Sequence, residues 1–437
     1  MKYANSVSDM LNAFSQDPLT IEQLDEFYCD DTMEYRMSDK YSSPIEDIFD
    51  DCQQAGGHNA FLLLGHRGCG KSTELTKMSR NLISNGYPVK TIICSLDLDL
   101  LNIAYSDLLI LMGEALLEIA EESGCKIDAG ILGDMAHFWS EGTEITISQV
   151  TGEASVEAGM SAETPRLFAN ILNFFTRVKA ELKLNEETRK EYRNKISNHS
   201  SEWIGMMNRI SEEIAREKEG KLPTIIFEDL DKLNPDDAWK VFYNYAKLLS
   251  DMSFPVIYTF PIALSYDGKF SAMEGYFITR TLPMIKIETI EGTPYEDGIN
   301  IIRGIVEKRA RLDLFEGNVL DRLIQYTGGS LRDLFYAINS SAKRAERRSA
   351  AAISIEDSER ALEEIKTSLT RRIDQKDYEF LLNIYNGNKE QIEDREKLLK
   401  MLQASVVLEY NGRRWHNVHP LVVRFFIEQG KIKDVEE

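Results

Sequence analysis

The sequence lacks the features of a disulfide-stabilised or membrane-spanning protein. Its five cysteines, an odd number in 437 residues, form no CxxC pair, which argues against a disulfide framework and fits a reducing cytosol. No uncharged apolar run reaches the roughly 18 residues that a bilayer span needs, and the N-terminus shows no signal-peptide core. No segment repeats with a period of about 20 to 50 residues. We therefore expect a cytoplasmic protein without membrane contact.

Basic residues are outnumbered by acidic ones. Lys and Arg number 51 against 72 Asp and Glu, which gives a formal net charge of -21 at pH 7. Such a surface repels phosphate backbones, so any contact with DNA must be a local patch. With 43% hydrophobic residues the chain is too apolar to be disordered, and it is too long for one compact domain.

Apolar strands alternate with helical stretches from residue 60 to residue 290. The expected strands are 60–65, 89–96, 224–227, 254–260 and 284–287. Strands separated by helices indicate an α/β fold, here a five-stranded parallel sheet covered on both faces. The gap between the second and third strands is long for a crossover, so we interpret 102–220 as a mostly helical insertion. Within it, 143–148 and 151–165 predict a hairpin or a mobile loop.

The remaining chain predicts two helical units. Helices are expected at 294–309, 319–326 and 331–348, and after them helices lead to a two-stranded ribbon around the dipeptide Asn411-Gly412. Helices followed by such a ribbon predict a winged helix. The predicted domains are an N-terminal segment at 1–40, an α/β core at 41–290 that contains the insertion, a helical lid at 291–350 and a winged-helix domain at 351–437.

A phosphate-binding motif follows the first strand. Residues 65–72 read G-H-R-G-C-G-K-S and match the Walker A pattern G-x-x-x-x-G-K-[ST] at every fixed position. Glycines let main-chain N–H groups and a helix N-terminus face the β- and γ-phosphates. Lys71 adds a mobile positive charge, and Ser72 would place its hydroxyl on Mg²⁺. The expected ATP-binding residues of this loop are Gly65, His66, Arg67, Gly68, Cys69, Gly70, Lys71, Ser72 and Thr73.

The third strand ends in acidic residues, as a Walker B strand does. Glu228 would support the Mg²⁺ shell, and Asp229 would orient or deprotonate the attacking water. The order is Glu-Asp, where Asp-Glu is commoner. Because the Asp side chain is shorter, slow turnover or simple nucleotide holding stays open as an alternative. A second alternative is that these acids belong to the surface around the helix cap at Asn234.

Together these motifs resemble an AAA+ P-loop ATPase of the Orc/Cdc6-like branch, close to the signalling ATPases called STAND. The resemblance implies that Arg332, which opens a helix after a Gly-Gly pair, is the sensor 2 of the lid. It implies that Arg280 is an arginine finger acting across a subunit interface, and that Thr259 is the sensor 1 residue. It also places Tyr28 and Arg36 in an N-terminal segment that borders the base.

The resemblance implies a function as well. We expect a molecular switch that binds and hydrolyses ATP, forms a homo-oligomer and controls a partner effector protein, with bacterial antiviral defence as a setting that family analogy suggests. A nucleotide-locked scaffold with little turnover and an Orc/Cdc6-like DNA-associated ATPase remain as alternatives. Residues 351–437 carry 14 Lys and Arg against 17 Asp and Glu, a net charge of -3, so DNA contact there is not favoured.

Overall fold

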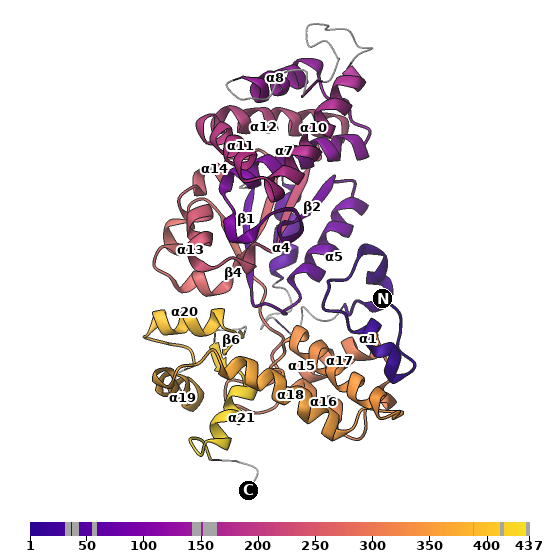
Figure 1. Cartoon of the computed structure of the whole chain (residues 1–437), viewed down its shortest axis with the longest axis vertical. Coiled ribbons are helices and arrows are strands. Elements are labelled where there is room, and N and C mark those ends of the chain that lie inside the picture. Colours follow the sequence, from indigo (N-terminus) through magenta and orange to yellow (C-terminus); the bar gives the residue numbers. More distant parts are fainter. Residues whose placement is uncertain are drawn as a thin grey trace.

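The computed structural model describes residues 1–30, 36, 43–54, 59–141, 150–151, 164–387, 389–410 and 415–433. A central sheet separates two helical regions (Figure 1). The upper region is formed by the chain segment that connects the second strand to the third, and the lower region is formed by the C-terminal third of the chain. The N-terminus lies beside the lower region. Within the described ranges, no helix combines the length and the apolar composition that a bilayer crossing requires.

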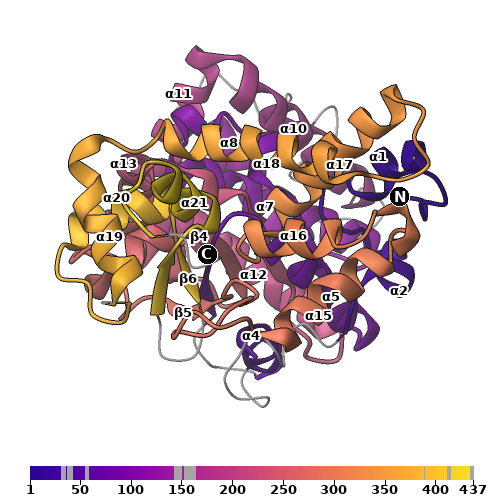
Figure 2. The same ribbon diagram turned by 90° about the horizontal axis from the view of Figure 1, so that it is seen from below.

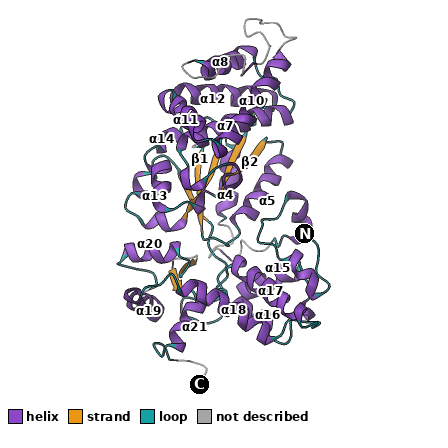
Figure 3. Cartoon of the chain, in the orientation of Figure 1, coloured by secondary structure: helices purple, strands orange, loops and turns teal. Residues whose placement is uncertain are grey.

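A five-stranded parallel sheet forms the centre of the described structure (Figure 3). Its strands are β1 (Ala60–Gly65), β2 (Val89–Ile93), β3 (Thr224–Glu228), β4 (Val256–Pro261) and β5 (Ile278–Thr281). Their spatial order is β2-β3-β4-β1-β5, and every paired strand runs parallel to its neighbour. The predicted α/β fold with a five-stranded parallel sheet is confirmed, and the loops that follow β1 and β3 meet at one edge.

Both faces of the sheet are covered, because successive side chains of a strand point to opposite faces. In β1, Phe61 and Leu63 pack into one core, and Leu62 and Leu64 pack into the other. The covering helices are α4 (Pro44–Gln53) and α5 (Lys71–Ser84) on the first face, and α7 (Tyr105–Glu122), α13 (Pro235–Ala238) and α14 (Ala246–Ser250) on the second.

The prediction of the fifth strand is wrong in position. The strand is the half-buried segment Ile278–Thr281, whereas 284–287 forms no strand. The reason is that β5 is an edge strand paired only with β1, so it needs no continuous apolar run. The apolar side chains of 284–287 are instead buried against the C-terminal part of the chain. Strand β2 also ends earlier than predicted, because α6 (Cys94–Asp97) follows it directly.

Residues 102–220, interpreted as an insertion, are mostly helical, as predicted. Besides α7, the segment contains α8 (Ala129–Ser140), α10 (Thr164–Leu184), α11 (Glu186–Asn198) and α12 (Ser200–Glu217). Trp139 and Trp203 are fully buried, with ring centroids 5.5 Å apart, and Trp203 Nε1 donates to the Leu109 carbonyl at 2.8 Å. The predicted hairpin or loop falls almost entirely on 142–149 and 152–163, which lie outside the described residues.

The helices of the predicted lid, called the lid from here on, and the C-terminal helices lie below the sheet (Figure 1). The lid contains α15 (Glu296–Glu307), α16 (Val319–Tyr326) and α17 (Leu331–Arg347), close to the predicted bounds. It is followed by α18 (Ile355–Thr370), α19 (Tyr378–Asn386), α20 (Arg395–Gln403) and α21 (Pro420–Glu428). Between α20 and α21, β6 (Val407–Tyr410) and β7 (Trp415–Val418) pair antiparallel as the C-terminal hairpin. The winged-helix assignment stays a prediction, and Asn411-Gly412 lies outside the described residues.

Candidate nucleotide-binding site

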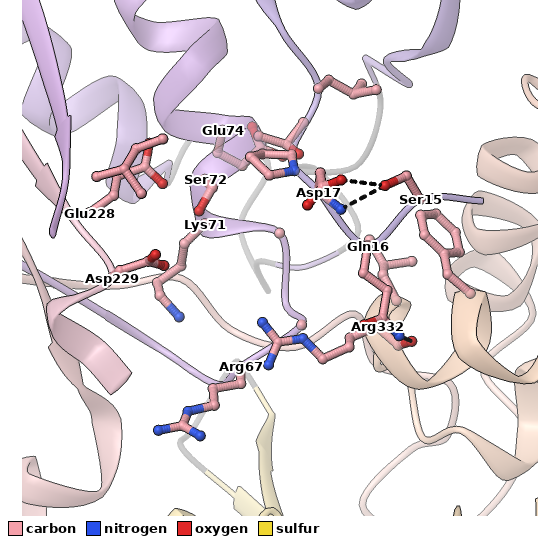
Figure 4. A pocket seen from close by; sticks show the side chains of 18 of the residues that line it. Ser15, Gln16, Asp17, Arg67, Lys71, Ser72, Glu74, Glu228, Asp229 and Arg332 are labelled. Atoms are coloured by element: carbon pink, nitrogen blue, oxygen red, sulfur yellow. Dashed lines mark hydrogen bonds between the residues drawn. The ribbon is translucent and has the colours of Figure 1, made fainter. Parts of the chain in front are cut away.

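The loop between β1 and α5 forms one wall of a cavity at the carboxyl edge of the sheet (Figure 4). Gly68 and Gly70 have φ angles of 85° and 98°, a conformation that glycine adopts without steric cost. A Cβ atom at Gly68 would lie 2.7 Å from the Cβ of Arg332, and the Leu331 N–H donates to the Gly68 carbonyl at 3.1 Å. Glycine at position 68 therefore allows the lid to touch the phosphate-binding loop.

The cavity has a volume of about 350 Å³, within the usual range of small-ligand sites. The predicted nucleotide-binding residues that line it are Tyr28, Arg36, Arg67, Gly68, Gly70, Lys71, Ser72 and Thr73. The predicted catalytic residues that also line it are Glu228, Asp229 and Arg332. The predicted residues that lie outside its lining are Gly65, His66, Cys69, Thr259 and Arg280.

Lys71 is almost completely buried, and it is held in place by oxygen atoms. Its Nζ lies 2.9 Å from Asp231 Oδ2 and donates to the carbonyls of Gly65 and His66 at 2.8 and 3.0 Å. Burial pulls the pKa of Lys71 down, but the Asp231 carboxylate outweighs burial and the pKa is raised. Although burial acts in the opposite direction, Lys71 holds the pKa of Asp231 below its usual value. Both groups are therefore charged, and a bound phosphate would compete with Asp231 for the ammonium.

Ser72 and Glu228 offer two oxygen ligands side by side. Glu228 ends β3, is 6% exposed and accepts a hydrogen bond from the Ser72 hydroxyl. Burial raises the pKa of Glu228 to about 7, although the bond from Ser72 opposes the shift. Across the described residues, no group of three or more His, Cys, Asp or Glu side chains could hold a metal. The Ser72 hydroxyl beside the Glu228 carboxylate fits Mg²⁺, which commonly takes one carboxylate and completes its shell with phosphate oxygens and water.

Asp229 lies on the cavity wall in the turn that follows β3. Its φ of 70° is left-handed, a conformation that aspartate tolerates better than most residues. The carboxylate accepts a hydrogen bond from the Ser95 hydroxyl and lies 2.6 Å from Lys232 Nζ. Thr259, predicted as sensor 1, supports this turn from behind: its Oγ1 accepts from the Leu230 N–H at 3.1 Å and donates to the main chain of β3. Its hydroxyl thus binds backbone and lies outside the cavity.

Arg332 opens α17 and lines the cavity from the lid side, opposite Lys71 and Ser72 (Figure 4). Gln16 from the N-terminal segment donates to the Arg332 carbonyl at 3.3 Å. The neighbouring Asp333 lies 3.9 Å from His419 Nε2, so its carboxylate faces the C-terminal helices. The Arg332 position suits the lid role that the sequence predicts, and the role itself stays a prediction.

Tyr28 and Arg36 reach the cavity from the N-terminal part of the chain. The Tyr28 hydroxyl donates to Glu74 Oε2, one turn into α5, at 2.8 Å. Arg36 is 1% exposed, and its Nη1 donates to the carbonyls of Cys69 and Pro283 at 2.5 and 3.0 Å. Arg36 thus supports the phosphate-binding loop from outside the sheet.

Arg280 lies within β5 rather than before the fifth strand, as a consequence of the corrected strand position. It is 31% exposed, and its guanidinium lies 3.2 Å from Asp47 Oδ2 and 3.5 Å from Asp51 Oδ2 on α4. These ion pairs hold it away from the cavity of its own chain. A finger role would require a second subunit, and it stays a prediction.

The C-terminal hairpin is bonded directly to the phosphate-binding loop. His66 is 2% exposed, and its Nε2 accepts a hydrogen bond from the Glu409 N–H at 2.8 Å. Burial, together with the Lys71 charge, lowers the pKa of His66 to about 3, so the imidazole is neutral. Tyr410 donates to the Gly328 carbonyl at 2.8 Å and so ties the hairpin to the lid as well. Seen from below in Figure 2, the lid helices and the hairpin lie side by side.

Several cavity residues carry no role in the sequence-based prediction. Asp231 follows Glu228 and Asp229 in one acidic run, so the run itself was the signal for it. Arg309, two residues after α15, and Ser95, after β2, lie in no motif, and only the fold brings them to the cavity.

No protein-family model and no curated protein matches the chain. The solved structures that are similar to it include three of archaeal ORC2 and Cdc6 proteins. ORC2 of Aeropyrum pernix in its ADPNP–ADP complexes shows 13% identity over 89% of this chain and 93% of that one, with a TM-score of 0.35. Cdc6p from Pyrobaculum aerophilum shows 13% identity over 97% of each chain with a TM-score of 0.38, and the ADP form of ORC2 shows 11% over 97% and 98% with a TM-score of 0.37.

Proposed function

We propose that the protein is a molecular switch that binds and hydrolyses ATP with Mg²⁺. The observation that carries this proposal is one cavity in which the Walker A loop, the Ser72–Glu228 pair and Arg332 of the lid meet. A ligand in that cavity would touch the sheet, the lid and the N-terminal segment together. Binding of the ligand would therefore stabilise one relative arrangement of the sheet, the lid and the N-terminal segment over the others.

The residues divide the chemistry among them. Ser72 and Glu228 would hold Mg²⁺, which, when bound, neutralises charge that develops on the phosphates. Lys71 would stabilise the transferring phosphoryl group with a charge that Asp231 now neutralises. Asp229 would position the attacking water, and Arg332 would close the lid over the phosphates.

The output of the switch is proposed to pass through the C-terminal hairpin. His66 belongs to the phosphate-binding loop and is hydrogen-bonded to Glu409 of the hairpin. A shift of the loop would therefore change the position of the hairpin. We place a partner effector protein on that C-terminal region and a second copy of the chain at Arg280, with bacterial antiviral defence as the biological setting. The five cysteines form no disulfide, which suits the cytoplasm.

Mass photometry and phosphate release, measured together with and without ATP and Mg²⁺, test this proposal. The proteins are the wild type, Lys71→Ala, Asp229→Ala and Arg280→Ala, with Arg311→Ala as control, because Arg311 is 53% exposed and pairs only with nearby Asp313 among the described residues. We expect ATP to drive assembly and Arg280→Ala to abolish phosphate release while nucleotide still binds. A wild type that neither assembles nor turns over would contradict the switch.

A nucleotide-locked scaffold is the second candidate, and one observation favours it. The Asp229 carboxylate is already engaged by Ser95 and Lys232, which leaves less of it for water. In the same experiment this candidate requires bound ATP without phosphate release. The DNA-associated alternative must overcome the net charge of -21, and retention of the wild type by duplex DNA at physiological salt would support it.

A further inference from the structure

A buried arginine lies on the cavity wall without an anionic partner in the described part of the chain. Arg309 is 5% exposed and follows the last turn of α15. Its Nη1 donates to the carbonyls of Phe27 and Ile305 at 3.1 and 2.8 Å. Its Nε is buried without a hydrogen bond, and Nη2 makes none with the described residues. One edge of the guanidinium is therefore unused.

Burying N–H groups of a charged guanidinium without hydrogen-bond partners lowers the stability of the fold. A buried charge is normally paired or fully hydrogen-bonded, because transfer out of water removes its solvation. Burial lowers the pKa of Arg309 to about 10, which still leaves the side chain charged near neutral pH. The missing hydrogen bonds are consequently available to an acceptor that enters the cavity.

The wall around Arg309 has the character of a site for a flat ring. The guanidinium carbon lies 5.2 Å from the centre of the Phe335 ring, and Leu19, Phe27 and Ile305 add apolar surface to the same cavity. The phosphate-binding end is defined separately by Lys71 and the loop glycines. Aromatic and apolar surface with one polar group is how proteins commonly hold a base.

We propose that Arg309 binds the nucleobase, donating from its unused edge to an acceptor atom on the rim of a purine ring. The inference rests on the proposed nucleotide-binding function and adds the residue that would read the base. Adenine presents the ring nitrogens N1, N3 and N7 as acceptors. Guanine presents O6 beside N7, a pair that fits two parallel arginine N–H groups. The acceptor chemistry is shared, and the experiment separates the two bases.

The test compares ATP and GTP with analogues in which one acceptor nitrogen of the base is replaced by carbon. Affinities are measured by calorimetry for ATP, GTP, 1-deaza-ATP, 3-deaza-ATP, 7-deaza-ATP and 7-deaza-GTP, on the wild type, Arg309→Gln and Arg309→Lys. Arg311→Gln is the matched control, because it removes an exposed arginine a short distance along the chain. Lysine keeps the charge but loses the planar fork, so it separates charge from geometry.

We expect one deaza analogue to bind the wild type about 10- to 100-fold more weakly than its parent, because the buried donor is then left unpaired. In Arg309→Gln that difference should shrink severalfold, whereas in Arg311→Gln it should persist. A merely structural role for Arg309 would weaken all nucleotides alike. A wild type that binds every analogue as tightly as its parent would overturn the inference, even if both Arg309 variants failed to fold.

The failure of this inference is distinguishable from that of the proposed function. If nucleotides bind the wild type and Lys71→Ala abolishes binding, but no deaza effect depends on Arg309, only the base-reading role is lost. If no nucleotide binds the wild type, or if Lys71→Ala binds as well as the wild type, both proposals are wrong.

Discussion

The two ends of the sheet differ in the kind of side chain that they bury. At the carboxyl edge, Lys71 and Arg309 are buried beside a cavity, and Asp231, which pairs with Lys71, is 10% exposed. At the other end, the insertion buries aromatic rings, with Trp203 stacked on Phe175 at a centroid distance of 5.7 Å. Burying charge costs free energy that a ligand can recover, whereas burying rings stabilises the fold outright. We therefore expect ligand affinity and stability to respond to different ends of the molecule.

The largest expected effect is on stability and comes from the insertion. Trp203→Ala should lower the free energy of unfolding by about 3–5 kcal/mol, because it opens a cavity in a close-packed aromatic core and removes the hydrogen bond to the Leu109 carbonyl. Denaturant titration measures this change. Nucleotide affinity of the folded variant should stay at the wild-type value. Leu184→Ala, at an 84% exposed position of the same bundle, should change neither quantity.

The next effect lies at the carboxyl edge and should appear in affinity. Lys71→Ala should weaken ATP binding by about 100-fold or more, equivalent to about 2.7 kcal/mol, because it removes a cation directed at the phosphates. Calorimetry with ATP and Mg²⁺ checks it. Arg80→Ala, on the same helix but paired with exposed Asp25, should bind as the wild type does. Equal losses in both variants would show that α5 as a whole, rather than Lys71, governs affinity.

A smaller effect is expected where the lid meets the loop. Gly68→Ala should weaken nucleotide binding about tenfold, because the new Cβ would lie 2.7 Å from that of Arg332 and push the lid away. Gly124→Ala is the matched control. Its φ of 67° is also left-handed, but nothing lies within 4 Å of the added atom. The control should lose about 1 kcal/mol of stability from backbone strain and keep its affinity.

The smallest effect is a pH dependence at His66. The folded pKa of about 3 lies below the ordinary value of 6.5, so the unfolded state binds a proton that the folded state excludes. Stability from this group is present above pH 6.5 and is lost as the pH falls toward 3. Between pH 7 and pH 6 the loss is about 0.7 kcal/mol for an unfolded pKa near 6.5. Urea titrations at pH 7 and pH 6 measure this change in the free energy of unfolding. The wild type should lose that amount more than His66→Gln does, and equal losses in the two proteins would contradict this account.

The sequence predicts the features that depend on residues close together in the chain. It does not predict those that depend on packing between distant segments. The Walker A residues and Glu228 are recognisable because strand, loop and helix lie next to each other in the chain. Strand β5 was misplaced, because its short polar segment looks less like a strand than the buried run at 284–287. Arg309 was missed for a related reason: its place in the cavity depends on Phe27 and on the lid, which the sequence does not bring together.

The hydrogen bond between His66 and Glu409 also sets an order of events during synthesis. Its partners are 343 residues apart, so at roughly 5 to 20 residues per second the ribosome needs about 20 to 70 s to deliver the second after the first. During that time the phosphate-binding loop exists without the hairpin that supports it. A ribosome-bound chain that ends before residue 409 should therefore hold nucleotide less tightly than the released protein. The molecule can therefore acquire its finished site only after residue 409 has been translated.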